Sequence, residues 1–171
     1  MEQTGNNPSK GLMALLTGAC CISGWLAGAN IDRYIVQLPA WKYVNIIDWA
    51  EYSRHADLGN GLWLYPLEAV GTFILLLAAS IIAIKNRATL KKITVQICAA
   101  AFFAVLKIAL SALSSPVIMR LKTSGNDRQL LQKAFDQYHF WSPYNGIVQL
   151  SCFFFCLVSL LQLTVIQSSL P

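Results

Sequence analysis

Residues 62–115 read LWLYPLEAVGTFILLLAASIIAIKNRATLKKITVQICAAAFFAVLKIALSALSS, and this stretch decides the fold. Two apolar blocks, 62–84 and 93–115, flank the basic segment KNRATLKK. Each block has the roughly 20 residues that a helix rising 1.5 Å per residue needs to cross about 30 Å of hydrocarbon. The stretch therefore predicts two membrane-spanning helices joined by a short loop.

Two further apolar blocks, 11–31 and 144–166, lie on either side of this pair. Hydrophobic residues make up 56% of the 171, and only 12% are charged, about half the level of an average soluble domain. Block 11–31 lacks a signal-peptide cleavage pattern, so we expect it to be retained. The sequence predicts an all-α integral membrane four-helix bundle, a single domain over 1–171 with helices at about 11–31, 62–84, 93–115 and 144–166.

The segments between the blocks are more polar and rich in aromatic residues. Residues 32–60 contain Pro39, at which we expect helical structure to be interrupted. They also contain the aromatics Trp41, Tyr43, Trp49 and Tyr52. Such aromatics favour the headgroup level, which predicts a short interfacial helix there. The third span is expected to stop before Pro116, and 117–140 to form a separate amphipathic lead-in helix ahead of the fourth span.

The distribution of basic residues predicts the orientation. The loop between the second and third spans holds Lys85, Arg87, Lys91 and Lys92 and no acidic residue, which indicates the cytoplasmic side. Both termini then lie in the cytoplasm, the two longer segments lie outside, and the cell inner membrane is the expected location. We expect the basic residues behind the net charge of +5 to set the orientation of the helices in the membrane and to contact membrane lipid. No compact basic face or motif indicates nucleic acid as a partner.

The five cysteines all lie inside apolar blocks. This placement does not suit an oxidised disulfide framework, and packing is the simplest role for them. Cys152 and Cys156 share a helix face, but a pair of this kind is a weak metal signal, and we expect no metal site. The five are Cys20, Cys21, Cys98, Cys152 and Cys156.

Two charged residues, Glu68 and Lys107, lie inside the apolar blocks. Because the second and third spans run antiparallel, each lies about eight residues, or roughly 12 Å, below the outer boundary. A charge at membrane depth is costly and indicates function by default. The matching depth predicts that the two side chains face each other as a buried ion pair, either for packing or for function.

Other polar groups converge on the same outer half, where facing helices can build a pocket for a hydrophobic small molecule. His55 lies near Arg54 and Asp57, which makes it the better acid–base candidate of the two histidines. The inner half offers no comparable set of ionisable groups. We predict catalytic roles for His55, Glu68, His139 and Tyr144, and substrate-binding roles for Arg33, Asn60, Lys107 and Asn145.

Three stretches resemble small four-helix membrane proteins related to fungal anthrone oxygenases. They are QLPAWKYV (37–44), WAEYSRHADLGNGLWLYPLEAVG (49–71) and FDQYHFWSPYNGIVQLSCFF (135–154). The resemblance implies oxidation of a hydrophobic, polycyclic aromatic substrate by molecular oxygen, without a bound cofactor. A phenolic substrate needs a base, for which the resemblance leaves His55, His139, Glu68 and Tyr144 as candidates.

The leading functional prediction is thus a membrane-embedded oxidoreductase, a cofactor-independent oxygenase acting on an aromatic or lipid-like substrate in the outer pocket. One alternative is a haem- or metal-binding protein that uses His55 and His139. A second is a non-catalytic accessory subunit, since Gly24 and Gly28 have the small-residue spacing of a homo-oligomer interface. A transporter is a third, although four helices without repeats would have to assemble.

Overall fold

The computed structural model describes residues 8–168, and it is helical from end to end apart from short turns. Four helical runs are long and apolar enough to cross a membrane: Lys10–Trp41, Ile46–Lys85, Leu90–Lys122 and Arg128–Ser168. The all-α four-helix prediction is therefore confirmed. In chain order the elements are α1 (Pro8–Asp32), the π-helical turn η1 (Arg33–Gln37), α2 (Leu38–Trp41), α3 (Ile46–His55), a second π-helical turn η2 (Ala56–Asn60), α4 (Gly61–Lys85), α5 (Arg87–Met119), the 3₁₀ turn η3 (Arg120–Lys122) and α6 (Arg128–Ser168).

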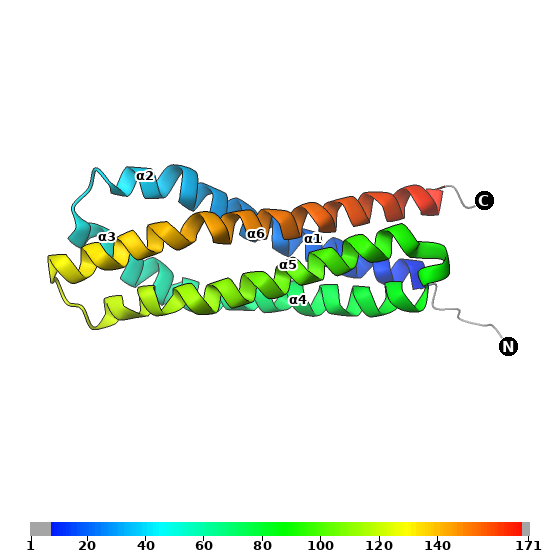
Figure 1. Ribbon diagram of the computed structural model, residues 1–171, viewed down its shortest axis with the longest axis horizontal. Coiled ribbons are helices and arrows are strands. Elements are labelled where there is room, and N and C mark those ends of the chain that lie inside the picture. The colour runs from blue at the N-terminus through cyan, green and yellow to red at the C-terminus, as the bar shows by residue number, and fades with distance from the viewer. Residues whose placement is uncertain (1–7, 169–171) are drawn as a thin grey trace.

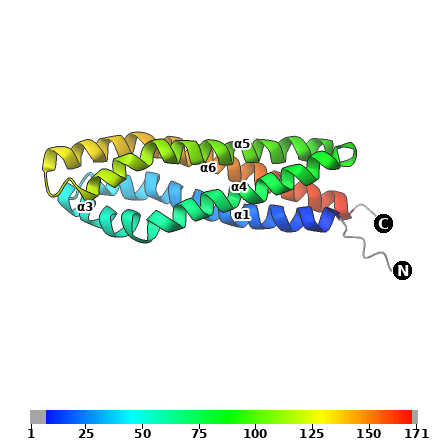
Figure 2. The same cartoon turned by 90° about the horizontal axis from the view of Figure 1, so that it is seen from below.

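The four long helices form a square bundle. Helix α1 packs against α4 and α6, and α5 packs against the same two helices. Figures 1 and 2 show the start of α1, the end of α6 and the α4–α5 turn at one end of the bundle, which we call the terminal end. At the opposite, capped end lie α2, α3 and the connection between α5 and α6 (Figure 1). The capped end is the one that the sequence predicts to be outside.

The terminal half has a dry, apolar core. Small residues on α4 and α5 (Ala79, Ala83, Ala100) are fully buried and let the backbones approach, while Leu12 and Leu16 fill the space from α1. The buried thiols of Cys152 and Cys156 lie in this core, and all five cysteines are free. Cys20 is buried as well, so the predicted packing role agrees with the placement of these three, whereas Cys21 and Cys98 are exposed on the bundle surface.

A second cluster of apolar side chains closes the capped end, and we call it the cap cluster. Trp49 of α3 is 2% exposed there and meets Phe135 edge to face, with ring centroids 5.1 Å apart. Trp49 therefore does not face lipid headgroups with its side chain, because α3 packs onto α5 and α6 and buries it within the protein. The buried members are Leu38, Trp49, Ala50, Val117, Ile118, Leu121, Leu131, Ala134 and Phe135.

The sequence predicted helix ends at Pro39 and before Pro116 and a separate helix ahead of the fourth span, and the structure shows continuous helices instead. Helix α5 continues through Pro116 to Met119, and α6 is one 41-residue helix through Pro143, so no separate lead-in helix exists at 117–140. The first run also continues through Pro39 to Trp41. A proline inside a helix costs about 3 kcal/mol, but residues just beyond it, such as Val117 and Ile118, are buried in the cap cluster. Their burial offsets that cost.

The glycines of α1 take part in contacts within the chain. A Cβ at Gly24 would lie 2.9 Å from the Phe153 ring of α6, and one at Gly18 would lie 3.3 Å from Leu75 of α4. Only at Gly28 among these three is the space open. Close packing inside the bundle therefore accounts for Gly18 and Gly24.

Candidate functional site

A pocket of about 420 Å³ lies within the capped half of the bundle, directly below the cap cluster. Its volume falls in the range of about 300–1,000 Å³ that is typical of small-molecule sites. All four long helices and η2 contribute to its wall. The lining residues are Leu26, Ala29, Asn30, Arg33, Asp57, Leu58, Gly61, Leu62, Tyr65, Pro66, Ala69, Val70, Lys107, Ile108, Ser111, Ala112, Ser114, Ser115, Ile118, Met119, Tyr138, Trp141, Ser142 and Asn145.

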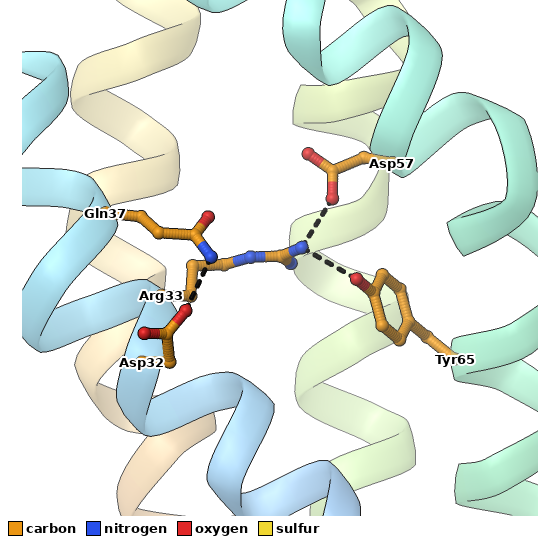
Figure 3. Close-up of polar contacts among 5 residues, drawn as sticks. All are labelled: Asp32, Arg33, Gln37, Asp57 and Tyr65. Carbon is orange, nitrogen blue, oxygen red and sulfur yellow. Dashed lines mark hydrogen bonds and ion pairs between the residues drawn. The ribbon is translucent and has the colours of Figure 1, made fainter.

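Arg33 crosses the bundle from the first helical run to η2 and α4 (Figure 3). Its Nη2 donates to the Asp57 carboxylate at 2.7 Å and to the Tyr65 hydroxyl at 2.9 Å. The guanidinium also lies over the rings of Tyr65 and Tyr138, at 5.1 and 5.8 Å from their centroids. Because the Arg33 and Asp57 side chains are only 22% and 9% exposed, this is a mostly buried and well-satisfied pair.

Lys107 is the second cation of the pocket. It is 7% exposed, and its Nζ donates to the Asn145 side-chain oxygen at 2.7 Å. The Asn145 amide in turn donates to the Trp141 carbonyl at 3.1 Å, which fixes the oxygen toward Lys107. The ammonium therefore has a neutral partner, and within residues 8–168 the structure gives it no carboxylate.

Glu68 does not pair with Lys107. Its Oε2 is buried without a hydrogen-bond partner, and its side chain is absent from the lining of the pocket. Residues 62, 65, 66, 69 and 70 form the face of α4 that lines the pocket, and Glu68 lies outside that face. The predicted ion pair is thus wrong, because equal depth on antiparallel helices does not fix the direction of a side chain.

The two histidines lie apart from the pocket. His55 is exposed at the end of α3, while Asp57 pairs with Arg33 and Arg54 binds the α5–α6 connection. His139 is half-buried, and its ring lies 6.3 Å from that of Phe135. Neither lines the pocket, and among the described residues no three His, Cys, Asp or Glu side chains form a metal-binding group.

Tyr144 and Asn60 are also exposed and away from the pocket. Tyr144 is 48% exposed on the surface of α6, where its ring packs beside Phe140 and Trp141. Of the eight residues predicted for the site, the structure brings Arg33, Lys107 and Asn145 to the pocket wall and leaves the other five outside it.

Sequence reasoning missed Tyr65 and Tyr138 and placed Asp57 beside the wrong partner. A signal for Tyr138 exists in the sequence, because Tyr138, Trp141, Ser142 and Asn145 follow one helix face at i, i+3, i+4 and i+7. Recognising it requires that 128–168 be read as one helix. The sequence instead predicted a separate helix at 117–140, whereas α6 runs on through Pro143.

The chain is a four-helix bundle whose four long helical runs are long and apolar enough to cross a membrane, and its capped half holds the pocket that contains Arg33 and Lys107. In comparisons with protein-family models, curated proteins and solved structures, nothing matches this chain.

Proposed function

We propose that this membrane protein binds a hydrophobic small molecule in the pocket of the capped half, with an acidic oxygen of the ligand beside Lys107. The observation that carries the proposal is the buried Lys107 ammonium, which has three donors and, among the described residues, one acceptor, the neutral amide of Asn145. The pocket wall holds two cations, Arg33 and Lys107, and one carboxylate, Asp57, which Arg33 already engages. A negatively charged ligand oxygen would give Lys107 the counter-ion that the pocket wall does not supply.

The energetic argument favours a ligand over a purely structural role. A buried charge without a counter-ion is costly, and replacing it by an apolar residue is often neutral or stabilising. The rest of the wall is largely aliphatic, with residues such as Leu26, Leu62 and Ile108. Such a wall suits an apolar body, and the Lys107–Asn145 pair suits a single acidic group.

A second candidate is the oxygenase activity that the sequence resemblance implies. Three aromatic side chains, Tyr65, Tyr138 and Trp141, line the pocket that contains Lys107, and this favours a planar aromatic substrate. In such a reaction, a methylene carbon conjugated through an aromatic ring to a ketone loses a proton, and Lys107 stabilises the enolate oxygen that the ketone becomes. Molecular oxygen then supplies one atom to the new carbonyl group, and the other leaves as water. Both methylene hydrogens end in the water that is formed.

The orientation and location are also proposals. Lys85, Arg87, Lys91 and Lys92 lie at the terminal end of the bundle, which favours that end on the cytoplasmic side. The pocket then lies in the half of the bundle facing outward, in the cell inner membrane.

The binding proposal is tested with the protein in lipid nanodiscs and two probes, a fluorescent long-chain carboxylic acid and its methyl ester. The acid should bind more tightly than the ester. Lys107→Gln should weaken binding of the acid at least about tenfold, because a hydrogen bond to a charged group contributes about 1.5–3 kcal/mol. The ester should bind equally to wild type and variant.

Lys133→Gln is the matched control, since Lys133 is an exposed residue of α6 and the charge change is the same. Equal binding of the acid to wild type and Lys107→Gln would refute the proposal. The oxygenase candidate is tested on the same samples with a polycyclic aromatic ketone and an oxygen electrode. Oxygen uptake should depend on Lys107, and its absence would remove this candidate while leaving the binding proposal intact.

A further inference from the structure

We infer that the pocket receives its ligand from the bilayer, through a lateral opening between α4 and α5, and that the ligand class is membrane-dissolved lipophilic acids and not water-soluble anions. The inference rests on the proposed binding function and adds to it the route and the physical state of the ligand. Three independent features of the structure carry it: the exposure pattern of the wall, the closed cap and the surroundings of the opening.

The exposed residues of the pocket wall all lie on α4 and α5. They are Pro66 and Val70 on α4, and Ala112, Ser115 and Met119 on α5. The lining residues contributed by α1, η2 and α6 are buried or half-buried. Since α4 and α5 pack side by side, these exposed residues form the two rims of one opening, which we call the lateral mouth.

The cap cluster closes the pocket toward the capped end. Ile118 belongs both to the pocket wall and to the cap cluster, so the cluster lies directly over the pocket. Behind it, Leu38, Trp49, Leu121 and Leu131 are at most 2% exposed. A close-packed apolar layer of this kind leaves no path for a hydrated anion.

Arg54 fastens this closure. Its guanidinium donates to the Leu121 carbonyl at 3.0 Å, to the Gly125 carbonyl and to the Asn126 side chain, and thereby ties α3 to the α5–α6 connection. The helix that carries Trp49 is thus held over the pocket by bonds to the backbone of the neighbouring segment. We infer that the cap stays closed while the ligand enters at the side.

Large, exposed apolar side chains flank the lateral mouth on both helices. Leu67 of α4 is 71% exposed and Leu113 of α5 is 62% exposed, and each lies next to a rim residue in the sequence. Large apolar side chains so exposed on a spanning helix face lipid tails. The mouth therefore opens into hydrocarbon, where a neutral or lipophilic acid can dissolve and a small hydrophilic anion cannot.

Photoaffinity labelling of the wild-type protein tests the route. A long-chain carboxylic acid with a diazirine at the end of its chain is added to protein in nanodiscs, irradiated, and mapped by mass spectrometry. Labelling should concentrate on the rim residues, Pro66 and Val70 of α4 and Ala112, Ser115 and Met119 of α5, and excess unlabelled acid should suppress it. Labelling on α2 or α3 instead would overturn the inference.

A kinetic experiment gives a second measurement. Ser115→Trp places a large side chain on the rim, and Leu113→Trp, which lies off the pocket wall, is the control. Transfer of the fluorescent acid from donor vesicles should slow about tenfold in Ser115→Trp, for association and dissociation alike, because a narrowed route affects both directions. Leu113→Trp should match wild type.

The outcomes separate the two proposals. If Lys107→Gln binds the acid as well as wild type does, the proposed function fails whatever the route. If Lys107→Gln loses binding but Ser115→Trp speeds dissociation or leaves both rates unchanged, only the lateral route fails. If short, water-soluble carboxylates such as acetate occupied the pocket as well as the long-chain acid does, and displaced it, the assigned ligand class would be overturned.

Discussion

Arg33 and Lys107 show how two buried cations in one pocket come to differ. Arg33 has a carboxylate at 2.7 Å, a phenol at 2.9 Å and two aromatic rings beneath its guanidinium. Lys107 has one amide oxygen. The first group is therefore satisfied by the protein and holds η2 against the first helical run, whereas the second is available to a ligand.

This difference leads to a stability prediction for Asp57. Asp57→Asn removes the counter-ion from a guanidinium that is only 22% exposed, so unfolding should become easier by about 1.5–3 kcal/mol, the contribution of a hydrogen bond to a charged group. Reversible unfolding in mixed detergent micelles measures it. Asp32→Asn is the control, because the exposed Asp32 carboxylate accepts from a neutral partner, the Gln37 side-chain amide at 2.6 Å, and its effect should stay within about 0.5 kcal/mol. Equal effects of the two variants would contradict this assignment.

From the sequence, the depth of a residue along the bundle axis can be predicted better than the direction in which its side chain points. Glu68 and Lys107 lie in the predicted half, yet Glu68 lies off the pocket-lining face of α4. Rise per residue gives depth from the chain alone, but the face that turns inward depends on which helices become neighbours. The same limit explains Tyr144, which lies one position before the buried Asn145 and points out of the bundle.

At the scale of the helix, the sequence was enough to predict which segments form the four long helices, but not the residues at which those helices begin and end. Proline is a local signal, and it predicted an end before Pro116 that did not occur, while the predicted separate helix at 117–140 proved to belong to α5 and α6. After Pro143, the buried residues Val148 and Gln149 hold α6 against its neighbours, and the Gln149 amide donates to the Ser23 carbonyl of α1 at 3.1 Å. Contacts of this kind lie far apart in the sequence, and no local pattern reveals them.

Helix α3 gives the prediction that belongs to this scale. Arg54→Gln shortens the side chain that ties α3 to residues 121–126, so α3 should open more readily without loss of the four-helix bundle. Amide hydrogen exchange should rise about tenfold in 46–55 and 120–127, which corresponds to about 1.4 kcal/mol of local stability. The exposed Arg128 provides the control, and Arg128→Gln should leave exchange in α3 unchanged. Exchange that rises equally along α4 would indicate general destabilisation instead.

For the whole molecule, apolar block length and count were enough to predict the bundle. Four blocks joined by short segments predict neighbouring antiparallel helices, and the square arrangement of α1, α4, α5 and α6 agrees with this. The pocket itself was harder to predict, because it depends on where α3 and the start of α6 close over the bundle. At about 60 Å, the 41-residue α6 is roughly twice as long as the hydrocarbon is thick, so part of the bundle extends beyond it.

The proposed orientation is tested by labelling single cysteines from outside intact cells, with the five native cysteines replaced by alanine. Asp127→Cys lies in the connection between α5 and α6 at the capped end and should react with a membrane-impermeant maleimide. Asn86→Cys lies in the α4–α5 turn at the terminal end and should react only after the cells are permeabilised. The reverse pattern would place the pocket in the cytoplasmic half.

The π-helical turn η1 has a consequence for helical phase. The Leu38 amide bonds the Arg33 carbonyl, five residues back, so both side chains turn inward, Arg33 to the pocket and Leu38 to the cap cluster. In an uninterrupted α-helix, positions five apart lie about 140° apart around the axis. The segment thus behaves as an insertion of one residue. Deleting the exposed Val36 would return the segment to an uninterrupted α-helix, in which Leu38 follows Arg33 by four positions and lies only about 40° from it around the axis. Both side chains would still turn inward, so in an alignment this site should tolerate a gap of one residue better than other positions of the run.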